Sequence, residues 1–312
     1  FFAPMLSRAT SVTLRANVPS RTMATEKQIL KRIQSTTSIS KITKSMKMVS
    51  ASKLRGDQNR LALARPFAKW TASVYEEPLP CNLEERGEER ELQMGENNLI
   101  VTLTSDRGLC GGVNTWASKY TVQAANDIVA HGKPVNIFVV GEKGRGQLRR
   151  LARDHLVGSA TDASKLPYNF SQVCAIAMEV CKHDFTTAHV VFNKFVSAIA
   201  YETHIQTLER ASVPATADEG EDPMVEYEFE PENKDEVLED MYEYSLACAM
   251  YGNVMESATS EQSSRMNAME NASKNASEMI ESLTLQYNRA RQARITTELI
   301  EIISGASAIE DS

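Results

Sequence analysis

Several kinds of segment and motif are missing from this sequence, and each absence excludes a class of protein. No run of 18 or more apolar residues occurs in the 312 residues, which argues against a membrane-spanning helix. The five histidines form no HExxH or paired metal pattern, and no GxSxG motif or Cys–His pairing is present. We therefore expect a chain that is not itself catalytic and that holds no metal and no cofactor.

The cysteines and the charges also limit the interpretation. Five cysteines are an odd number, none with metal-ligand spacing, which is typical of reduced thiols in a non-oxidising compartment. The formal charge of −7 hides a segregation, because residues 24–60 hold nine basic side chains against two acidic ones. Residues 214–240 hold twelve acidic side chains against one lysine. This asymmetry predicts a partner with an acidic surface near the N-terminal segment, although each stretch could also be a solvated face.

The first residues differ from the rest. They contain Arg8, Arg15 and Arg21, six Ser/Thr residues and no acidic residue before Glu26. This composition is typical of a mitochondrial transit peptide, and a disordered tail is the alternative. We expect residues 1–23 to be removed and the mature chain to begin near Ala24.

An N-terminal helical segment follows, over residues 24–80. Ile39, Ile42, Met46 and Val49 have the 3-4-3 spacing of a coiled-coil seam. The pattern weakens at Gly56, where we expect the helix to bend or loosen. Residues 76–98 contain two prolines and a charged run, and we interpret them as a loop.

The C-terminal segment, residues 234–312, contains no proline and predicts a second long helix. A continuous helix of this length would extend roughly 110 Å, so it needs a partner, and antiparallel pairing with the N-terminal helix is the simplest solution. The predicted seam is rich in small residues, with fourteen Ser, Thr, Asn or Ala in the 22 residues 257–278. It runs along five positions: Met269, Ala272, Ala276, Met279 and Leu283. The last turns form an apolar tip that requires a socket; it contains Leu299, Ile302, Ile303 and Ile309.

The middle of the chain, residues 97–210, alternates strand and helix patterns. Strands are predicted at 99–104, 135–140 and 190–196, with an edge strand at 199–208. Helices are predicted at 114–130, 143–153 and 169–183. This rhythm predicts an α/β fold in which a Rossmann-like parallel-sheet domain accompanies the antiparallel coiled coil. An acidic connector, residues 211–233, would join this domain to the C-terminal helix.

Two glycine-rich turns follow predicted strands, at residues 105–112 and 141–146. Such turns can cradle phosphate, but neither has the GxGxxG or GxxxxGK[ST] order, so a tight structural turn is the favoured interpretation. Two alternatives follow from these features alone. A Rossmann enzyme with helical extensions would bind a nucleotide, and a purely structural coiled-coil protein would self-associate as a rod.

Several blocks of sequence resemble the gamma subunits of F-type ATP synthases. They are residues 41–54 (KITKSMKMVSASKL), the turn at 104–112 (TSDRGLCGG), and four C-terminal stretches at 260–269, 271–276, 287–293 and 295–305. Because these blocks occur in order along residues 24–310, the chain is identified as similar to that family. Residues 113–250 match it in arrangement more than in sequence, and Gly56 and the acidic residues 214–232 depart from what we expect of it.

The resemblance implies a central shaft inserted in a ring of alpha and beta subunits, with a Rossmann-like foot on the delta and epsilon subunits and the c-ring. Such a shaft couples c-ring rotation to ATP chemistry on the beta subunits. It lies on the matrix side of the mitochondrial inner membrane, as a peripheral subunit that binds no nucleic acid. By position, Met46 and Lys47 would face an acidic loop of a beta subunit. The positions that would hold a beta subunit in its open or closed state are Arg265, Arg291, Gln292, Thr296 and Glu298, and the apolar tip would sit in the sleeve of the ring.

Overall fold

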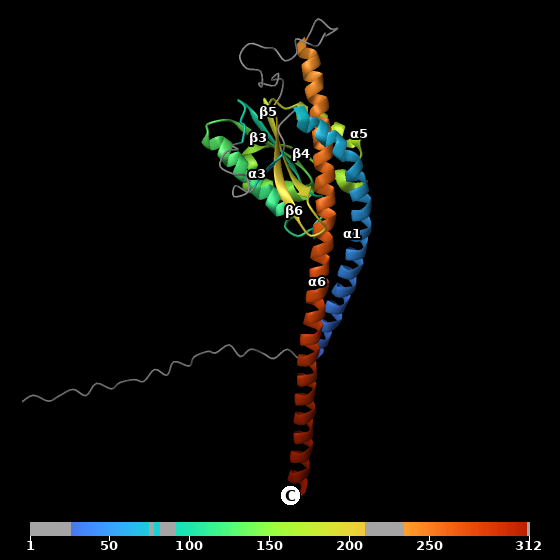
Figure 1. The fold of residues 1–312 in the computed structure, drawn as a ribbon. Coiled ribbons are helices and arrows are strands. Elements are labelled where there is room, and N and C mark those ends of the chain that lie inside the picture. Colours follow the sequence, from blue (N-terminus) through green and yellow to red (C-terminus); the bar gives the residue numbers. More distant parts are fainter. Residues whose placement is uncertain (1–25, 75–77, 82–91, 210–233, 311–312) are drawn as a thin grey trace, which may run out of the picture. The chain divides into compact units, whose positions relative to one another are not determined.

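The computed structural model describes residues 26–74, 78–81, 92–209 and 234–310 (Figure 1). The predicted transit peptide and the acidic connector lie outside these residues. The described residues of the chain divide into two compact units. Residues 26–38 with 277–310 belong to one unit, and the described residues between 39 and 276 belong to the other. Helices α1 (Glu26–Val74) and α6 (Lys234–Glu310) each contribute to both units.

The larger unit contains a six-stranded sheet in the order β1-β6-β5-β2-β3-β4. Strands β2 (Asn98–Leu103), β3 (Val135–Val140), β4 (Leu156–Ala160) and β5 (Thr187–Phe195) run parallel to one another. Strand β6 (Tyr201–Glu209) is antiparallel to β5, and the short β1 (Leu79–Pro80) is antiparallel to β6. The parallel core is thus as predicted, but the sheet as a whole is mixed.

Helices cover both faces of this sheet. On one face, α5 (Phe170–Cys181) and the first part of α6 pack on the strands in a core that includes Phe138, Phe192 and Tyr242. On the other face, α3 (Val113–Ala130) and α4 (Glu142–Leu151) pack on Ile100 and Ile137. Short 3-10 turns lie at Arg153–His155 and Ala163–Lys165. The result is a three-layer arrangement with parallel strands in the centre, which is the Rossmann-like layering.

The predicted elements agree with the observed ones to within a few residues, and two strands were missed. Strand β3 has the predicted bounds, whereas β5 begins three residues before the prediction. Strand β1 falls in the predicted loop and at the end of the predicted helical segment 24–80, whose described helix α1 ends at Val74. Strand β6 is not the outermost strand, because β1 pairs with it. Strand β4 was missed because its LVGSA sequence contains a glycine, which is unfavourable in strands. Gly158 is needed there, since a Cβ atom would lie 2.7 Å from the Phe138 ring.

The predicted seam of α1 is wrong. Ile39, Ile42 and Val49 are 53%, 58% and 57% exposed, and Met46 is half-buried. The buried positions of α1 instead recur every seven residues and are mostly small and polar, at Ile29, Thr36, Thr43 and Ser50, with Leu54 and Leu61 beyond. Small side chains permit close approach of the paired helix, so apolar size does not identify the inner face here.

The predicted seam of α6 agrees with the structure at four positions, and the fifth, Met279, lies at the edge of the contact with α1. Met269 and Ala276 are buried and Ala272 and Leu283 are half-buried, but Met279 is 55% exposed. Ile280, one position later, is half-buried instead. The Met279 sulfur nevertheless lies 3.9 Å from the hydroxyl oxygen of Thr36 on α1, so this side chain contacts α1 from the edge of the seam.

Helix α1 also continues without interruption through Gly56, contrary to the expectation that it would loosen there. Leu54 and Leu61 on either side are buried, and Asp57 forms an ion pair with Arg60 one turn later. Burial of the flanking leucines outweighs the weak helix propensity of one glycine, which costs about 1 kcal/mol.

Candidate functional site

A cavity of about 600 Å³ in the larger unit is bordered by four separate segments. Helix α1 contributes residues between Ser45 and Arg60, and α6 contributes residues between Ala258 and Arg265. The other two walls are the glycine-rich turn at residues 107–109 and the segment at residues 164–168. The cavity therefore brings together the blocks at residues 104–112 and 260–269, which lie far apart in the sequence.

Positive charge predominates around this cavity. Five basic side chains line it, against two acidic ones. The basic ones are Lys53, Arg60, Arg107, Lys165 and Arg265, and the acidic ones are Asp57 and Glu261. Three of the basic groups have acidic partners, in the pairs Arg60–Asp57, Lys165–Asp162 and Arg265–Glu261. Among the described residues, Lys53 and Arg107 form no ion pair, so this cavity favours an anionic occupant.

The glycine-rich turn is held by its second residue, Asp106. The Asp106 carboxylate accepts hydrogen bonds from the backbone N–H groups of Glu142, Asp162 and Ser164, each at 3.0 Å, and from the Ser164 hydroxyl at 2.7 Å. Burial alone would raise the pKa of Asp106, but these hydrogen bonds together outweigh burial and lower it. Asp106 thus fastens the turn to the start of α4 and to the neighbouring loop.

The same turn presents an apolar side chain in a strained backbone conformation. Leu109 has φ of 65° and is 61% exposed, although a branched side chain seldom adopts positive φ. The following Gly111 also has positive φ, at 64°. Strained residues of this kind gather at binding surfaces, and Leu109 lines the cavity beside Arg107.

Arg265 links α6 to the glycine-rich turn. Its guanidinium forms an ion pair with Glu261 and donates to the Gln262 side chain at 3.1 Å. Its longer contacts, at 3.4 and 3.5 Å, reach the carbonyl oxygens of Gly108 and Arg107. Arg265 is only 6% exposed, so most of its bonding capacity is used within the chain. Burial raises the pKa of Glu261, and Arg265 opposes that rise in part.

Lys47, also predicted to contact a partner, lies on the paired helices. Its ammonium group lies 2.7 Å from the Glu270 carboxylate of α6, with both side chains partly exposed. An exposed pair of this kind contributes at most about 1 kcal/mol to stability. Met46, next to it, is half-buried and lines the 600 Å³ cavity. The structure therefore brings Met46 and Arg265 to one cavity, with Lys47 beside it on α1.

The other predicted contacts lie in the smaller unit, near the end of α6. The side chains of Arg291, Gln292, Thr296 and Glu298 are all exposed. Arg294 lies between them and pairs with Glu26, the first residue of α1, at 3.2 Å. Beyond that pair α6 has no α1 residue to cover it, so its apolar tip is exposed: Leu299 at 55%, Ile302 at 73%, Ile303 at 56% and Ile309 at 77%.

Sequence reasoning missed part of this site. It discounted the turn at 105–112 as a structural turn and did not single out Lys53, Arg107 or Leu109. A signal was present, because Asp106 and Arg107 follow directly after a predicted strand, where parallel sheets gather functional groups. No group of three or more potential metal ligands occurs among the described residues, and no described helix is long and apolar enough to cross a membrane.

Comparisons with known proteins give consistent results. The family model described as ATP synthase matches residues 25–309. An ATP synthase gamma chain from Paramagnetospirillum magneticum is 39% identical over 295 residues, covering 92% of this chain and all of that one. The mitochondrial ATP synthase F(1) complex subunit gamma of Rattus norvegicus is 39% identical over 289 residues, with the same coverage.

Solved structures show the same likeness. A chain in the central stalk/c-ring structure of Tetrahymena thermophila mitochondrial ATP synthase is 29% identical, with a TM-score of 0.56 over 74% of this chain and 99% of that one. A chain in the OSCP/F1/c-ring structure of Euglena gracilis mitochondrial ATP synthase has a TM-score of 0.74. It covers 91% of this chain and 94% of that one at 21% identity, which supports the shared fold.

Proposed function

This chain belongs to the ATP synthase gamma family, and from that premise we propose how its described surfaces carry out the work of the central shaft. As a gamma subunit, the chain is the central shaft of an ATP synthase. The finer proposal concerns the contacts. The basic cavity receives an acidic loop of a beta subunit, and the exposed end of α6 contacts the upper part of the alpha–beta ring.

The observation that carries this proposal is the excess of positive charge around the 600 Å³ cavity. Lys53 and Arg107 form no ion pair among the described residues, although the charge of Lys53 acts on Asp57, and Leu109 is exposed beside them. An acidic loop with an apolar residue would satisfy both features, because charge pairing fixes its register and the apolar contact excludes water. Lys47 would lie at the border of this contact.

The proposed mechanism is a differential contact. A shaft that is not three-fold symmetric presents a different face to each of three beta subunits, and each face stabilises a different open or closed state. Shifting a site from nearly all open to nearly all closed needs about 5.5 kcal/mol of differential interaction. By thermodynamic reciprocity, the nucleotide state of each beta subunit must then bias the angle of the shaft.

The remaining proposals follow from the same premise. The chain carries out no chemistry itself, and ATP is made and hydrolysed on the beta subunits. Its partners are the alpha and beta subunits around the helices, and the delta and epsilon subunits and the c-ring at the domain of residues 97–210. It acts as a peripheral subunit on the matrix side of the mitochondrial inner membrane, after removal of residues 1–23. Mitochondrial gamma subunits among its relatives support this location.

Charge reversal at the cavity tests the proposed contact. We expect the double variant Lys53→Glu/Arg107→Glu, assembled into the complex, to lower coupled ATP synthesis by about tenfold or more, since each lost charge-assisted contact is worth roughly 1.5–3 kcal/mol. Arg149→Glu/Arg150→Glu is the matched control, because it makes the same two charge reversals at exposed positions of α4. If both variants synthesise ATP as the unmodified complex does, the cavity does not receive an acidic loop.

A further inference from the structure

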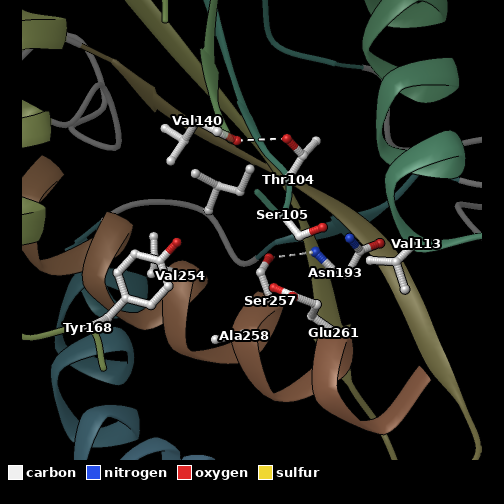
Figure 2. A pocket seen from close by; sticks show the side chains of 11 residues that line it. Thr104, Ser105, Val113, Val140, Tyr168, Asn193, Val254, Ser257, Ala258 and Glu261 are labelled. Carbon is white, nitrogen blue, oxygen red and sulfur yellow. Dashed lines mark hydrogen bonds between the residues drawn. The ribbon is translucent and has the colours of Figure 1, made fainter. Parts of the chain in front are cut away.

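A second, much smaller cavity lies where α6 crosses the carboxyl edge of the parallel strands (Figure 2). Its volume is about 20 Å³. Ser105 follows β2, Val140 ends β3 and Asn193 lies near the end of β5, and these three form the sheet side of the cavity. Ser257 and Glu261 of α6 border it from the other side. A space of this size holds about one water molecule.

One polar group at this cavity has no hydrogen-bond partner. Asn193 is fully buried, and its side-chain nitrogen Nδ2 has no hydrogen-bond partner among the described residues. Its side-chain oxygen Oδ1 accepts the Thr203 hydroxyl at 2.9 Å, so the amide is fixed on one side and unpaired on the other. Turning the amide over would only place the oxygen, in place of the nitrogen, without a partner. An unpaired buried polar group costs about 1–3 kcal/mol and calls for a bound partner.

Further polar groups line the same space. Glu261 uses carboxylate oxygen Oε1 for Arg265, which leaves its second oxygen available to accept another hydrogen bond. The Tyr168 side chain also lines the cavity (Figure 2). The backbone N–H of Asn193 already donates to the Ser257 hydroxyl at 3.1 Å, which brings β5 and α6 together at this point. A molecule that both accepts and donates would satisfy Asn193 and Glu261 at once.

We propose that one ordered water molecule binds in this cavity, accepting from Asn193 Nδ2 and donating to the Glu261 carboxylate. Water fits for two reasons. It has the size of the cavity, and it combines an acceptor for the amide with a donor for the carboxylate, which a monatomic cation or anion cannot do. The bound water joins β5 to α6 through Asn193 Nδ2 and the Glu261 carboxylate. The inference concerns the folded chain and does not depend on the proposed function.

The direct test is an experimental structure of the full-length chain, alone or in its complex, at a resolution that shows ordered waters. We expect density within hydrogen-bond distance of both Asn193 Nδ2 and Glu261. A cavity without density, or an Asn193 amide turned so that both of its polar atoms pair with protein groups, overturns the proposal.

A pair of valine variants gives an independent test. Val140→Ile adds one methylene group at the cavity, whereas Val139→Ile adds the same group on the opposite face of β3, away from it. Displacing a bound water would leave Asn193 unpaired, so we expect Val140→Ile to lower Tm more than Val139→Ile does. Filling a dry space would stabilise the fold instead, so a Val140→Ile variant that melts at or above the temperature of Val139→Ile overturns the proposal.

Discussion

Replacing Arg265 with alanine separates the role of this residue in folding from its role in partner contact. Arg265 and Glu261 are 6% and 9% exposed, so the variant leaves a buried carboxylate without its cation. Breaking a buried pair in this way costs about 3–5 kcal/mol. The long contacts to the carbonyls of Arg107 and Gly108, at 3.5 and 3.4 Å, add little. We therefore expect Arg265→Ala to lower Tm by about 10 °C, at roughly 3 °C per kcal/mol for a chain of this size.

The cost should depend on pH in a direction set by Glu261. Burial raises the pKa of Glu261 above its ordinary value of 4.5, and removing Arg265 raises this pKa further. A carboxyl group with a raised pKa in the folded state binds more protons when folded. The stability difference between variant and wild type is therefore small below pH 4.5 and grows as the pH rises through the raised pKa.

The double variant Glu261→Gln/Arg265→Met is the matched control, because it removes both charges while keeping similar volumes. Thermal unfolding of the purified full-length chain at pH 5 and pH 8 measures the effect. We expect the double variant to recover most of the lost stability and to lose the pH dependence. If Arg265→Ala unfolds like the double variant at both pH values, the buried pair does not have the energetic role described here. Any coupling defect that persists in the double variant would then belong to partner contact.

Other residues give shorter tests. Leu109→Asn should stabilise the chain by about 0.5–1 kcal/mol, because Asn tolerates positive φ better than Leu. Leu166→Asn, at a similarly exposed site with φ of −106°, is the control and should not stabilise the chain. Equal melting temperatures of the two variants would show that the Leu109 backbone is unstrained. Burial lowers the pKa of His189 from 6.5 to about 3, so between these pH values the unfolded chain binds one more proton than the folded chain. The free energy of unfolding therefore falls by up to about 1.4 kcal/mol per pH unit as the pH drops from 6.5 towards 3. His189→Gln should flatten this slope in acid titrations, and an unchanged slope would assign it to other groups. Ile302→Asn/Ile303→Asn should change the free energy of unfolding by less than about 0.5 kcal/mol, since both side chains are exposed. The same variant should dissociate from the assembled complex in gel filtration. Full retention in the complex would exclude the tip of α6 as a contact.

The sequence was informative where periodicity and burial coincide. Strands β2, β3 and β5 of the parallel core are mostly apolar and buried on both faces, as in Asn98–Leu103, and the sequence pattern located these three to within a few residues. The prediction for the α1 seam was wrong because burial and hydrophobicity do not coincide along this helix. Thr43 and Ser50 face inward while Ile42 and Val49 face outward, because the outer face of this helix is itself apolar. Hydrophobicity alone does not separate the inner from the outer face of this helix, because large apolar side chains lie on the outer face as well.

The candidate site could be predicted only in part from the sequence, because it is assembled from segments that are distant in the chain. Met46, Lys47 and Arg265 could be named from resemblance to a family, but their surroundings depend on long-range packing. The cavity forms because α1, the turn at 107–109 and α6 meet, and residues such as Lys53 and Gln262 are more than 200 positions apart in the chain. No local pattern indicates that Lys53 and Arg107 border the same space, or that Asp106 is held by three backbone N–H groups.

The most direct measurement of the central claim is rotation of this chain within its complex. The complex of alpha, beta and this chain would be fixed to a surface, with a bead attached at position 178, where Met178 is 66% exposed on α5. On addition of ATP, the account predicts that the bead turns in one direction in discrete steps and stops when hydrolysis is inhibited. Sustained ATP hydrolysis by the alpha and beta subunits with a stationary bead would contradict the account.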